Sequence, residues 1–172
     1  MRLFRRVGRE HLTPLGGTAN RSGRFWTIDR GWWLINIEFQ PSGWSVGSYL
    51  NVGVQHLWHR CDYRIFGYSS RQPIDGFGQF VDLDGDAGEP SAATDASARS
   101  ANKAARQWLD LFTDDHAHLT WIAARTADAW DAFDAAWAYV TLGEGAKATG
   151  IFGEVATRLD RSIGWQAELA TD

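Results

Sequence analysis

The chain has 172 residues, of which 44% are hydrophobic, 22% charged and 13% aromatic, and its formal net charge is −4. This composition excludes a disordered chain, a collagen-like repeat and a small disulfide-stapled protein. The single cysteine cannot form an internal disulfide, and no apolar run approaches the ~20 residues of a membrane-spanning helix. The sequence therefore predicts one domain over residues 1–172, in a reducing cytoplasmic compartment and without membrane contact.

The charge is unevenly distributed along the chain. Residues 1–30 contain seven arginines and two acidic residues, a net charge of +5, whereas the remainder has ten basic and nineteen acidic residues, a net charge of −9. A basic segment of this kind can contact phosphate groups. We favour the alternative that it neutralises the acidic second half of its own fold, and we do not expect a nucleic-acid partner.

The pattern of apolar residues changes its period along the first half of the chain. Leu3, Phe4 and Val7 share one helical face, which predicts a short leading helix. From residue 25 to residue 58 apolar side chains recur at every second position, which is typical of antiparallel strands with one covered face. We expect about four to five strands within residues 24–83. The shorter strand candidates are 63–68 and 77–83.

Two hairpins are predicted within the alternating region. The first closes at a two-residue turn, Arg30-Gly31, because glycine tolerates the positive φ of a tight turn. The second closes over residues 41–48. Matching its apolar faces requires the numbers of paired residues to sum to an odd value, and we favour 89 or 87. With 89, Phe39 faces Leu50. A slip of one residue would bring amide side chains into the core, so the faces are well determined.

The second face of this sheet carries polar side chains at alternate positions. They are Asn36, Glu38, Gln40, Tyr49, Asn51 and Gln55. Phe25, Trp32 and Leu34 share the parity of this face, and large apolar side chains are costly to leave in water. We therefore expect this polar face to be partly covered or to form an interface.

Residues 90–165 show helical spacing instead. A helix begins at Pro90 or Ser91, and Asp114 or Asp115 is placed to cap a second, short helix. The last two helices, on either side of Gly143, are predicted to form a helical hairpin. The order of elements indicates an α+β fold: a short N-terminal helix, an antiparallel sheet, and a C-terminal group of about three to four helices packed on the sheet.

The segment 31–58 contains two short sequence motifs, Phe39-Gln40-Pro41-Ser42 and Tyr49-Leu50-Asn51-Val52-Gly53. The chain resembles an uncharacterised bacterial family, domain-of-unknown-function family 4304, in these two motifs and in having a leading helix followed by two strands. The resemblance implies a bacterial origin. It implies no activity, because the family offers no catalytic residue to carry over.

The stretch Gly43-Trp44-Ser45-Val46-Gly47 matches G-x-S-x-G, the nucleophile elbow of α/β-hydrolases. That elbow requires a strand, a sharp turn and then a helix. Here an alternating strand follows, and glycine and serine are also common in hairpin loops. We interpret the stretch as a loop and expect no nucleophile there.

His56, His59 and Cys61 offer zinc ligands at close spacing. Alternation along a strand sends His56 and His59 to opposite faces, and a fourth ligand is not evident. We therefore expect no zinc site.

Asp82, Asp84 and Asp86 resemble the start of a calcium-binding loop, but Ala87 and Ala93 stand where glycine and glutamate are needed. The stretch 82–91 is therefore interpreted as a solvated loop. Since neither the zinc nor the calcium pattern is complete, the sequence predicts no bound metal, and it predicts no cofactor.

Ten tryptophans are an unusually high number for this length. Most lie on apolar stripes and are predicted to be buried. Trp44, within a Gly/Ser loop, and Trp32 are the best candidates for exposed aromatic residues, which can anchor a protein partner or a sugar.

The leading functional prediction is a non-enzymatic domain that binds a protein partner or a small polar ligand through the polar face and the Trp44 loop. The predicted binding residues are Asn36, Glu38, Gln40, Trp44, Tyr49, Asn51 and Gln55. The alternative is a small hydrolase or transferase with Glu38 as general base and Tyr49 polarising the substrate, although acid–base chemistry usually needs a second titratable group.

Overall fold

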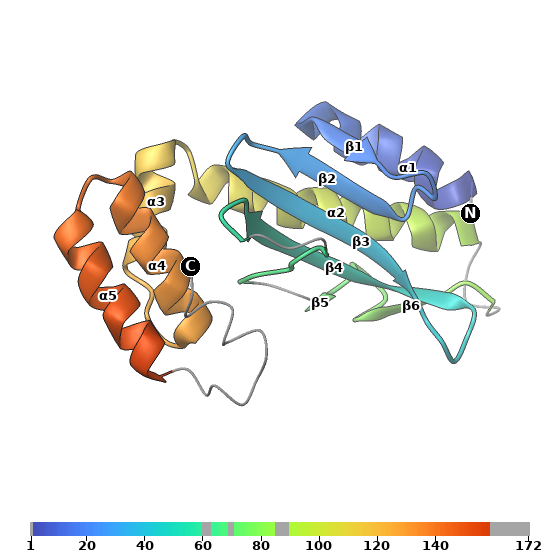
Figure 1. Ribbon diagram of the computed structural model, residues 1–172. Coiled ribbons are helices and arrows are strands. Elements are labelled where there is room, and N and C mark those ends of the chain that lie inside the picture. The colour runs from blue at the N-terminus through green and yellow to red at the C-terminus, as the bar shows by residue number, and fades with distance from the viewer. Residues whose placement is uncertain (1, 60–62, 69–70, 85–89, 159–172) are drawn as a thin grey trace. The chain divides into compact units, whose positions relative to one another are not determined.

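The computed structural model describes residues 2–59, 63–68, 71–84 and 90–158 (Figure 1). The chain falls into two compact units, residues 1–110 and 111–172. We call them the N-terminal and the C-terminal unit and describe each by itself. The expectation of a single domain stays a prediction.

The N-terminal unit consists of two helices and an antiparallel sheet. It begins with helix α1 (Arg2–Leu12) and a 3₁₀ turn, η1 (Thr13–Leu15), and it ends with α2 (Pro90–Leu111), whose last residue belongs to the other unit. The strands in the described residues are β1 (Gly17–Ala19), β2 (Phe25–Asp29), β3 (Trp33–Pro41), β4 (Gly47–His56), β5 (Arg71–Gln72) and β6 (Phe80–Asp82). They follow the order β1-β2-β3-β4-β5, and β6 also pairs with β4. The predicted α+β class is confirmed, and the short strands β1 and β5 were not predicted.

The pairing of β3 with β4 agrees with the predicted register. Phe39 pairs with Leu50 and Glu38 with Asn51, so the paired numbers sum to 89. Since apolar residues then meet on one face and polar residues on the other, burial of the apolar face is sufficient to select this register.

The first hairpin closes one residue later than predicted. The backbone N–H of Arg30 donates to the carbonyl oxygen of Trp33 at 3.0 Å, so the two turn residues are Gly31 and Trp32. Gly31 has a φ of +87°, and a tight hairpin turn with glycine at its first central position requires such a value. The predicted Arg30-Gly31 turn is therefore wrong. A turn at Arg30-Gly31 would make the numbers of paired residues sum to 61, whereas the observed pairs sum to 63. This shift of two residues leaves every side chain on its predicted face.

Segment 63–68 is not the strand that its alternation predicts. Within the described residues it contributes a single bridge, between Gly67 and Val54. The backbone of Ile65 instead bonds to side-chain amides of the sheet, as described below, and this leaves it no strand partner.

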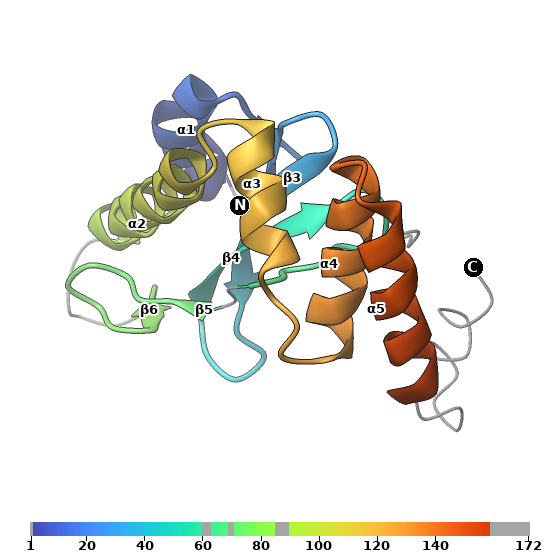
Figure 2. The same ribbon diagram turned by 90° about the vertical axis from the view of Figure 1, so that its left-hand side faces the viewer.

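Helices α1 and α2 lie side by side over the apolar face of the sheet (Figures 1 and 2). The ring of Phe4 in α1 stacks on that of Phe39 in β3, with centroids 4.8 Å apart. The buried residues of α2 are nearly all alanine, serine or threonine, and such small side chains let a helix approach a sheet closely. The buried sheet residues beneath the helices include Trp26, Ile28, Ile35, Ile37, Phe39, Leu50, Val52 and Val54. Burying each contributes about 1.5–3 kcal/mol, so this layer is the core of the unit.

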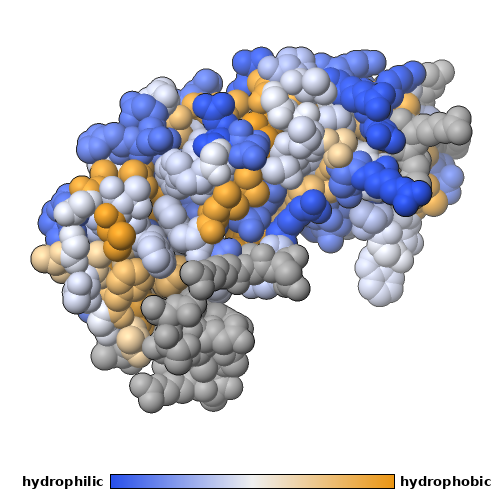
Figure 3. All heavy atoms as spheres, turned by 45° about the horizontal axis from the view of Figure 1, so that its top comes forward, coloured by the Kyte–Doolittle hydropathy of each residue, from blue (hydrophilic) through white to orange (hydrophobic). Residues whose placement is uncertain are grey.

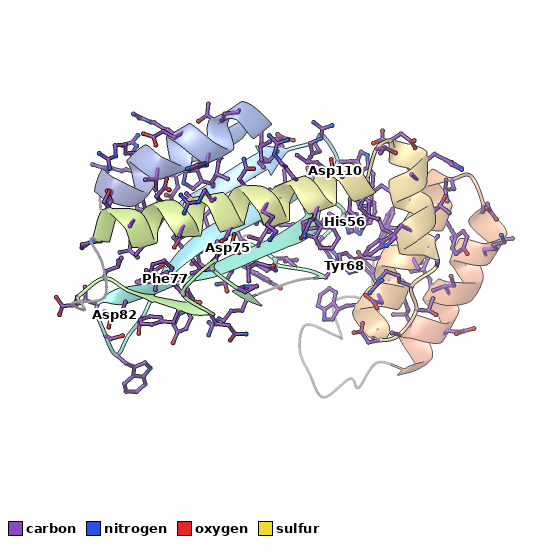
Figure 4. All side chains as sticks on the ribbon, turned by 180° about the vertical axis from the view of Figure 1, so that it is seen from behind. His56, Tyr68, Asp75, Phe77, Asp82 and Asp110 are labelled. Atoms are coloured by element: carbon purple, nitrogen blue, oxygen red, sulfur yellow. The ribbon has the colours of Figure 1, made fainter. Side chains whose placement is uncertain are left out.

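Polar contacts join the two helices to each other and to the loop after β5. His11 Nε2 lies 2.9 Å from Asp95 Oδ1, and the side-chain amide of Asn102 donates to the carbonyl oxygen of His11. The backbone N–H of Asp75 donates to Ser100 Oγ at 3.1 Å, and Figure 4 shows Asp75 against α2. Arg5, Arg6 and Arg9 of α1 are exposed, and Figure 3 shows many hydrophilic residues on the surface.

The C-terminal unit contains α3 (Asp115–Ala123), α4 (Ala129–Thr141) and α5 (Gly145–Arg158). Asp114 caps α3, as predicted, and Asp128 caps α4. Helices α4 and α5 form the predicted helical hairpin, with the Phe152 ring edge-on to Phe133 and Trp137 at 5.9 and 5.8 Å. No helix among the described residues is both long enough and apolar enough to cross a membrane.

Candidate functional site

The polar face of the sheet is the one opposite to α1 and α2. Because β3 and β4 pair as predicted, all six expected polar residues of these strands lie on this face, and they divide into two groups. Asn36, Glu38 and Gln55 line an open hollow. Gln40, Tyr49 and Asn51 lie farther along the same strands and contact mainly one another and Arg71.

The hollow, which we call the sheet hollow, has a volume of about 720 Å³. Its floor is formed by β2, β3 and β4, and its wall by segment 63–66. The lining residues are Phe25, Thr27, Leu34, Asn36, Glu38, Gln55, Tyr63, Arg64 and Phe66. The sheet hollow is therefore a concave site on the polar face, and its lining includes Asn36, Glu38 and Gln55.

Two buried amides hold the wall of the sheet hollow in place. Asn36 Nδ2 donates to the carbonyl oxygen of Ile65 at 2.9 Å and to Gln55 Oε1 at 2.8 Å. Gln55 Oε1 also accepts from the backbone N–H of Ile65 at 3.2 Å. Both backbone groups of Ile65 are thus satisfied by side chains, which do here what a neighbouring strand does elsewhere.

Aromatic contacts complete the wall. The guanidinium carbon of Arg64 lies 3.6 Å from the centre of the Phe25 ring, and the Phe66 ring meets Phe25 edge-on at 6.0 Å. Phe25 is buried as a result. The expectation that this face is partly covered is confirmed at this position.

Glu38 and Arg64 bring opposite charges to the sheet hollow. Glu38 Oε2 accepts a hydrogen bond of 3.1 Å from Asn51 Nδ2, its paired residue on β4. Within the described part of the chain, neither the Glu38 carboxylate nor the Arg64 guanidinium has an ion-pair partner at 4.0 Å or less. Both charged groups therefore remain available to a ligand.

The second group of polar residues forms a network that Asn51 connects to Glu38. Gln40 Oε1 accepts from Asn51 Nδ2 at 2.9 Å and from a guanidinium nitrogen of Arg71 at 3.2 Å. Arg71 covers the ring of Tyr49 at 3.8 Å, and Phe80 contacts the same ring at 4.9 Å. None of Gln40, Tyr49, Asn51 and Arg71 lines the sheet hollow, so their contacts stabilise the sheet beside it.

Trp44 lies apart from both groups. Its side chain is 97% exposed at the tip of the β3–β4 hairpin, and it does not line the sheet hollow. Ser42 Oγ accepts from the backbone N–H groups of Trp44 and Ser45, at 3.1 and 3.3 Å, which shapes the loop. Strand β4 begins at Gly47, so Ser45 is followed by a strand and not by the helix of a nucleophile elbow.

Trp32, the second predicted exposed aromatic, is half-buried. As a turn residue it stacks on the rings of Trp58 and His56, at 5.4 and 5.7 Å. The prediction is wrong because the turn lies one residue later than expected, which directs the indole against the end of β4.

The two histidines near the end of β4 do not diverge as predicted. β4 ends at His56 and a turn follows, so a ring nitrogen of His59 lies within 4.8 Å of one of His56. His56 is buried, stacks on Trp58 at 4.5 Å and lies beside Tyr68 (Figure 4). The third predicted zinc ligand, Cys61, lies outside the described residues.

Of the three aspartates that resemble a calcium loop, Asp86 also lies outside the described residues. Asp82 Oδ1 accepts a hydrogen bond of 2.9 Å from the backbone N–H of Asp84.

Sequence reasoning missed several residues of interest. Thr27, Arg64 and Phe66 line the sheet hollow, but no local pattern relates segment 63–66 to β2. Likewise Glu10, His11 and Asp95 bring three potential ligand atoms within 4.8 Å of one another between α1 and α2. His11 and Asp95 are 84 positions apart, so only the packing of the helices reveals this cluster.

No family model, curated protein or solved structure matches this chain. The resemblance of segment 31–58 to an uncharacterised bacterial family stays a prediction.

Proposed function

We propose that the N-terminal unit is a non-enzymatic binding domain that takes a small polar ligand into the sheet hollow. The observation that carries this proposal is an open volume of about 720 Å³ with a polar floor and an arginine–aromatic wall. Pockets for small ligands typically have about 300–1,000 Å³.

The way the wall is held supports the proposal. Ile65 is fixed at both its N–H and its carbonyl oxygen by Asn36 and Gln55, each at most 7% exposed. A wall held in this way is already ordered before a ligand arrives. Binding then loses little conformational entropy, which favours affinity for a small molecule.

The proposal is tested by titrating the ¹⁵N-labelled protein with amino acids, sugars, carboxylates and amines while recording backbone amide shifts. We expect at least one class to shift the amides of Thr27, Leu34 and Phe66 and to leave those of α5 unchanged. Thr27→Phe fills the sheet hollow and should abolish these shifts, whereas Thr120→Phe makes the same change at an exposed position of α3 and should not. Shifts that persist in Thr27→Phe, or no shifts with any class, would contradict the proposal.

The exposure of Trp44 favours a second candidate function, contact with a protein partner through the hairpin tip. Val46 in the same loop is 58% exposed, and exposed tryptophan side chains can anchor a protein partner. A photo-crosslinking amino acid placed at position 44 should yield one discrete adduct in the native host, and the same probe at Thr120 should yield none. Identical adducts at both positions would refute specific contact.

A hydrolase or transferase with Glu38 as general base stays the alternative. Its suggested partner, Tyr49, lies under Arg71 outside the sheet hollow, which does not favour joint action on one substrate. Should a substrate be found, unchanged turnover by Glu38→Gln would eliminate this mechanism.

A further inference from the structure

We infer that the ligand of the sheet hollow is a zwitterion of the α-amino acid class, with its ammonium group on Glu38 and its carboxylate on Arg64. This inference rests on the proposed function, because it specifies the chemistry of the same site.

The two charged groups are neighbours through Phe25. Arg64 lies over the Phe25 ring at 3.6 Å, and Phe25 pairs directly with Glu38 across β2 and β3. Directly paired positions in a sheet have Cβ atoms about 4.5–5.5 Å apart. Arg64 and Glu38 therefore flank one part of the sheet hollow, yet they form no ion pair with each other.

Each charged group keeps the hydrogen-bonding capacity that a zwitterion needs. Among the described residues, Glu38 accepts only from Asn51, through Oε2, which leaves Oε1 for an ammonium group. The guanidinium carbon of Arg64 lies 3.6 Å from the centre of the Phe25 ring, and among the described residues its N–H groups make no hydrogen bond or ion pair, so they can donate to a carboxylate. A molecule with both charges a few bonds apart satisfies both residues at once.

The uncharged lining suits the remainder of such a ligand. Phe25, Leu34 and Phe66 offer apolar surface beside the charged pair, and removal of apolar area from water favours binding. An α-amino acid with an apolar side chain uses the charged and the apolar lining together. A neutral sugar can hydrogen-bond to both residues through its hydroxyl groups but offers neither of them an opposite charge.

The inference is tested by calorimetry with the full chain and four probes: L-phenylalanine, 3-phenylpropionate, 2-phenylethylamine and glucose. The second lacks the ammonium group and the third the carboxylate. We expect L-phenylalanine to bind and each of the other three to bind at least about tenfold more weakly, which corresponds to about 1.4 kcal/mol.

Two variants then assign each charge to its residue. Glu38→Gln should weaken L-phenylalanine and 2-phenylethylamine but not 3-phenylpropionate, whereas Arg64→Gln should weaken L-phenylalanine and 3-phenylpropionate but not 2-phenylethylamine. Arg71→Gln is the matched control, because Arg71 also stacks on an aromatic ring of this face but does not line the sheet hollow. Thermal unfolding of each variant shows whether it is folded.

The outcomes separate this inference from the proposed function. Binding of glucose alone, with shifts at Thr27 and Phe66, overturns the zwitterion and leaves the binding domain. Equal binding of L-phenylalanine and both analogues also overturns it, as does a variant that weakens 2-phenylethylamine and 3-phenylpropionate to the same extent. If no probe binds and no compound class shifts the lining amides, both proposals fail.

Discussion

The side-chain amide of Asn36 donates a hydrogen bond of 2.8 Å to the side-chain oxygen of Gln55, across β3 and β4. Together the two residues hold the backbone of Ile65, ten positions beyond Gln55. The covering of the polar face, and with it the sheet hollow, therefore depends on two buried amides.

Asn36→Ala should destabilise the protein by about 1–3 kcal/mol, because the part-buried carbonyl oxygen of Ile65 loses its donor. Asn51→Ala, on the same face but half-buried, should cost about 0.5–1.5 kcal/mol, since water can replace its bonds. Urea unfolding gives both values, and hydrogen exchange should show faster opening at Ile65 only in Asn36→Ala. Equal losses, with unchanged exchange at Ile65, would show that this amide does not hold the wall.

Gly47→Ala should be destabilising by about 1–3 kcal/mol. A Cβ atom at Gly47 would lie 2.4 Å from the backbone carbonyl oxygen of Val81 and 2.1 Å from the Phe80 ring, so β6 would have to move. Gly43→Ala is the control in the same hairpin, because a Cβ there meets nothing within 4 Å. It should be neutral or slightly stabilising through the unfolded state. Thermal unfolding distinguishes the two variants, and similar midpoints would contradict the close approach of β6.

Asp114→Ala should cost about 1 kcal/mol, because Asp114 Oδ1 accepts from the backbone N–H of Ala117 at 2.8 Å and so caps α3. Asp114→Ser keeps a capping oxygen and should recover most of the loss. Chemical denaturation followed by far-UV circular dichroism measures both. A serine variant as unstable as the alanine variant would mean that the carboxylate acts by something other than capping.

Asp131→Asn should stabilise the protein at neutral pH. Burial first, and then the nearby Asp128 carboxylate, raise the pKa of Asp131 in α4 above its usual value, while Arg125 opposes this. The pKa is higher in the folded than in the unfolded state, so the contribution of Asp131 is most favourable at low pH and is lost as pH rises through the folded pKa.

The difference in unfolding free energy between Asp131→Asn and the wild type should therefore be positive at pH 7 and vanish below about pH 4. A stabilisation by Asp131→Asn that is the same at pH 3 and pH 7 would contradict this account of Asp131.

Much of the sheet follows from alternation alone. The apolar set around Phe39 and Leu50 must face the core, and since side chains alternate strictly along a strand, Glu38 and Asn51 must then share the opposite face. Because side chains alternate, a strand register that is wrong by two residues still places every side chain on the correct face. The turn at Gly31-Trp32 was therefore misplaced by one residue without any side chain changing its face.

Helix starts were predictable for a similar reason. Capping by Asp114 is a contact over three residues, between its side chain and the N–H of Ala117, and such contacts leave a signal in the local sequence.

The site required long-range information. Segment 63–66 alternates like a strand, but the amides of Asn36 and Gln55 compete for its backbone, and no local pattern reveals that competition. Arg64 reaches the sheet hollow by stacking on Phe25, which lies 39 positions earlier in the chain. The sequence by itself determined the α+β order, the polar face and its residues, because these depend on periods of two and 3.6. Only the tertiary structure decided that three of these residues line a hollow and three form a network beside it, because side-chain contacts between distant segments, not periodicity, divide the face.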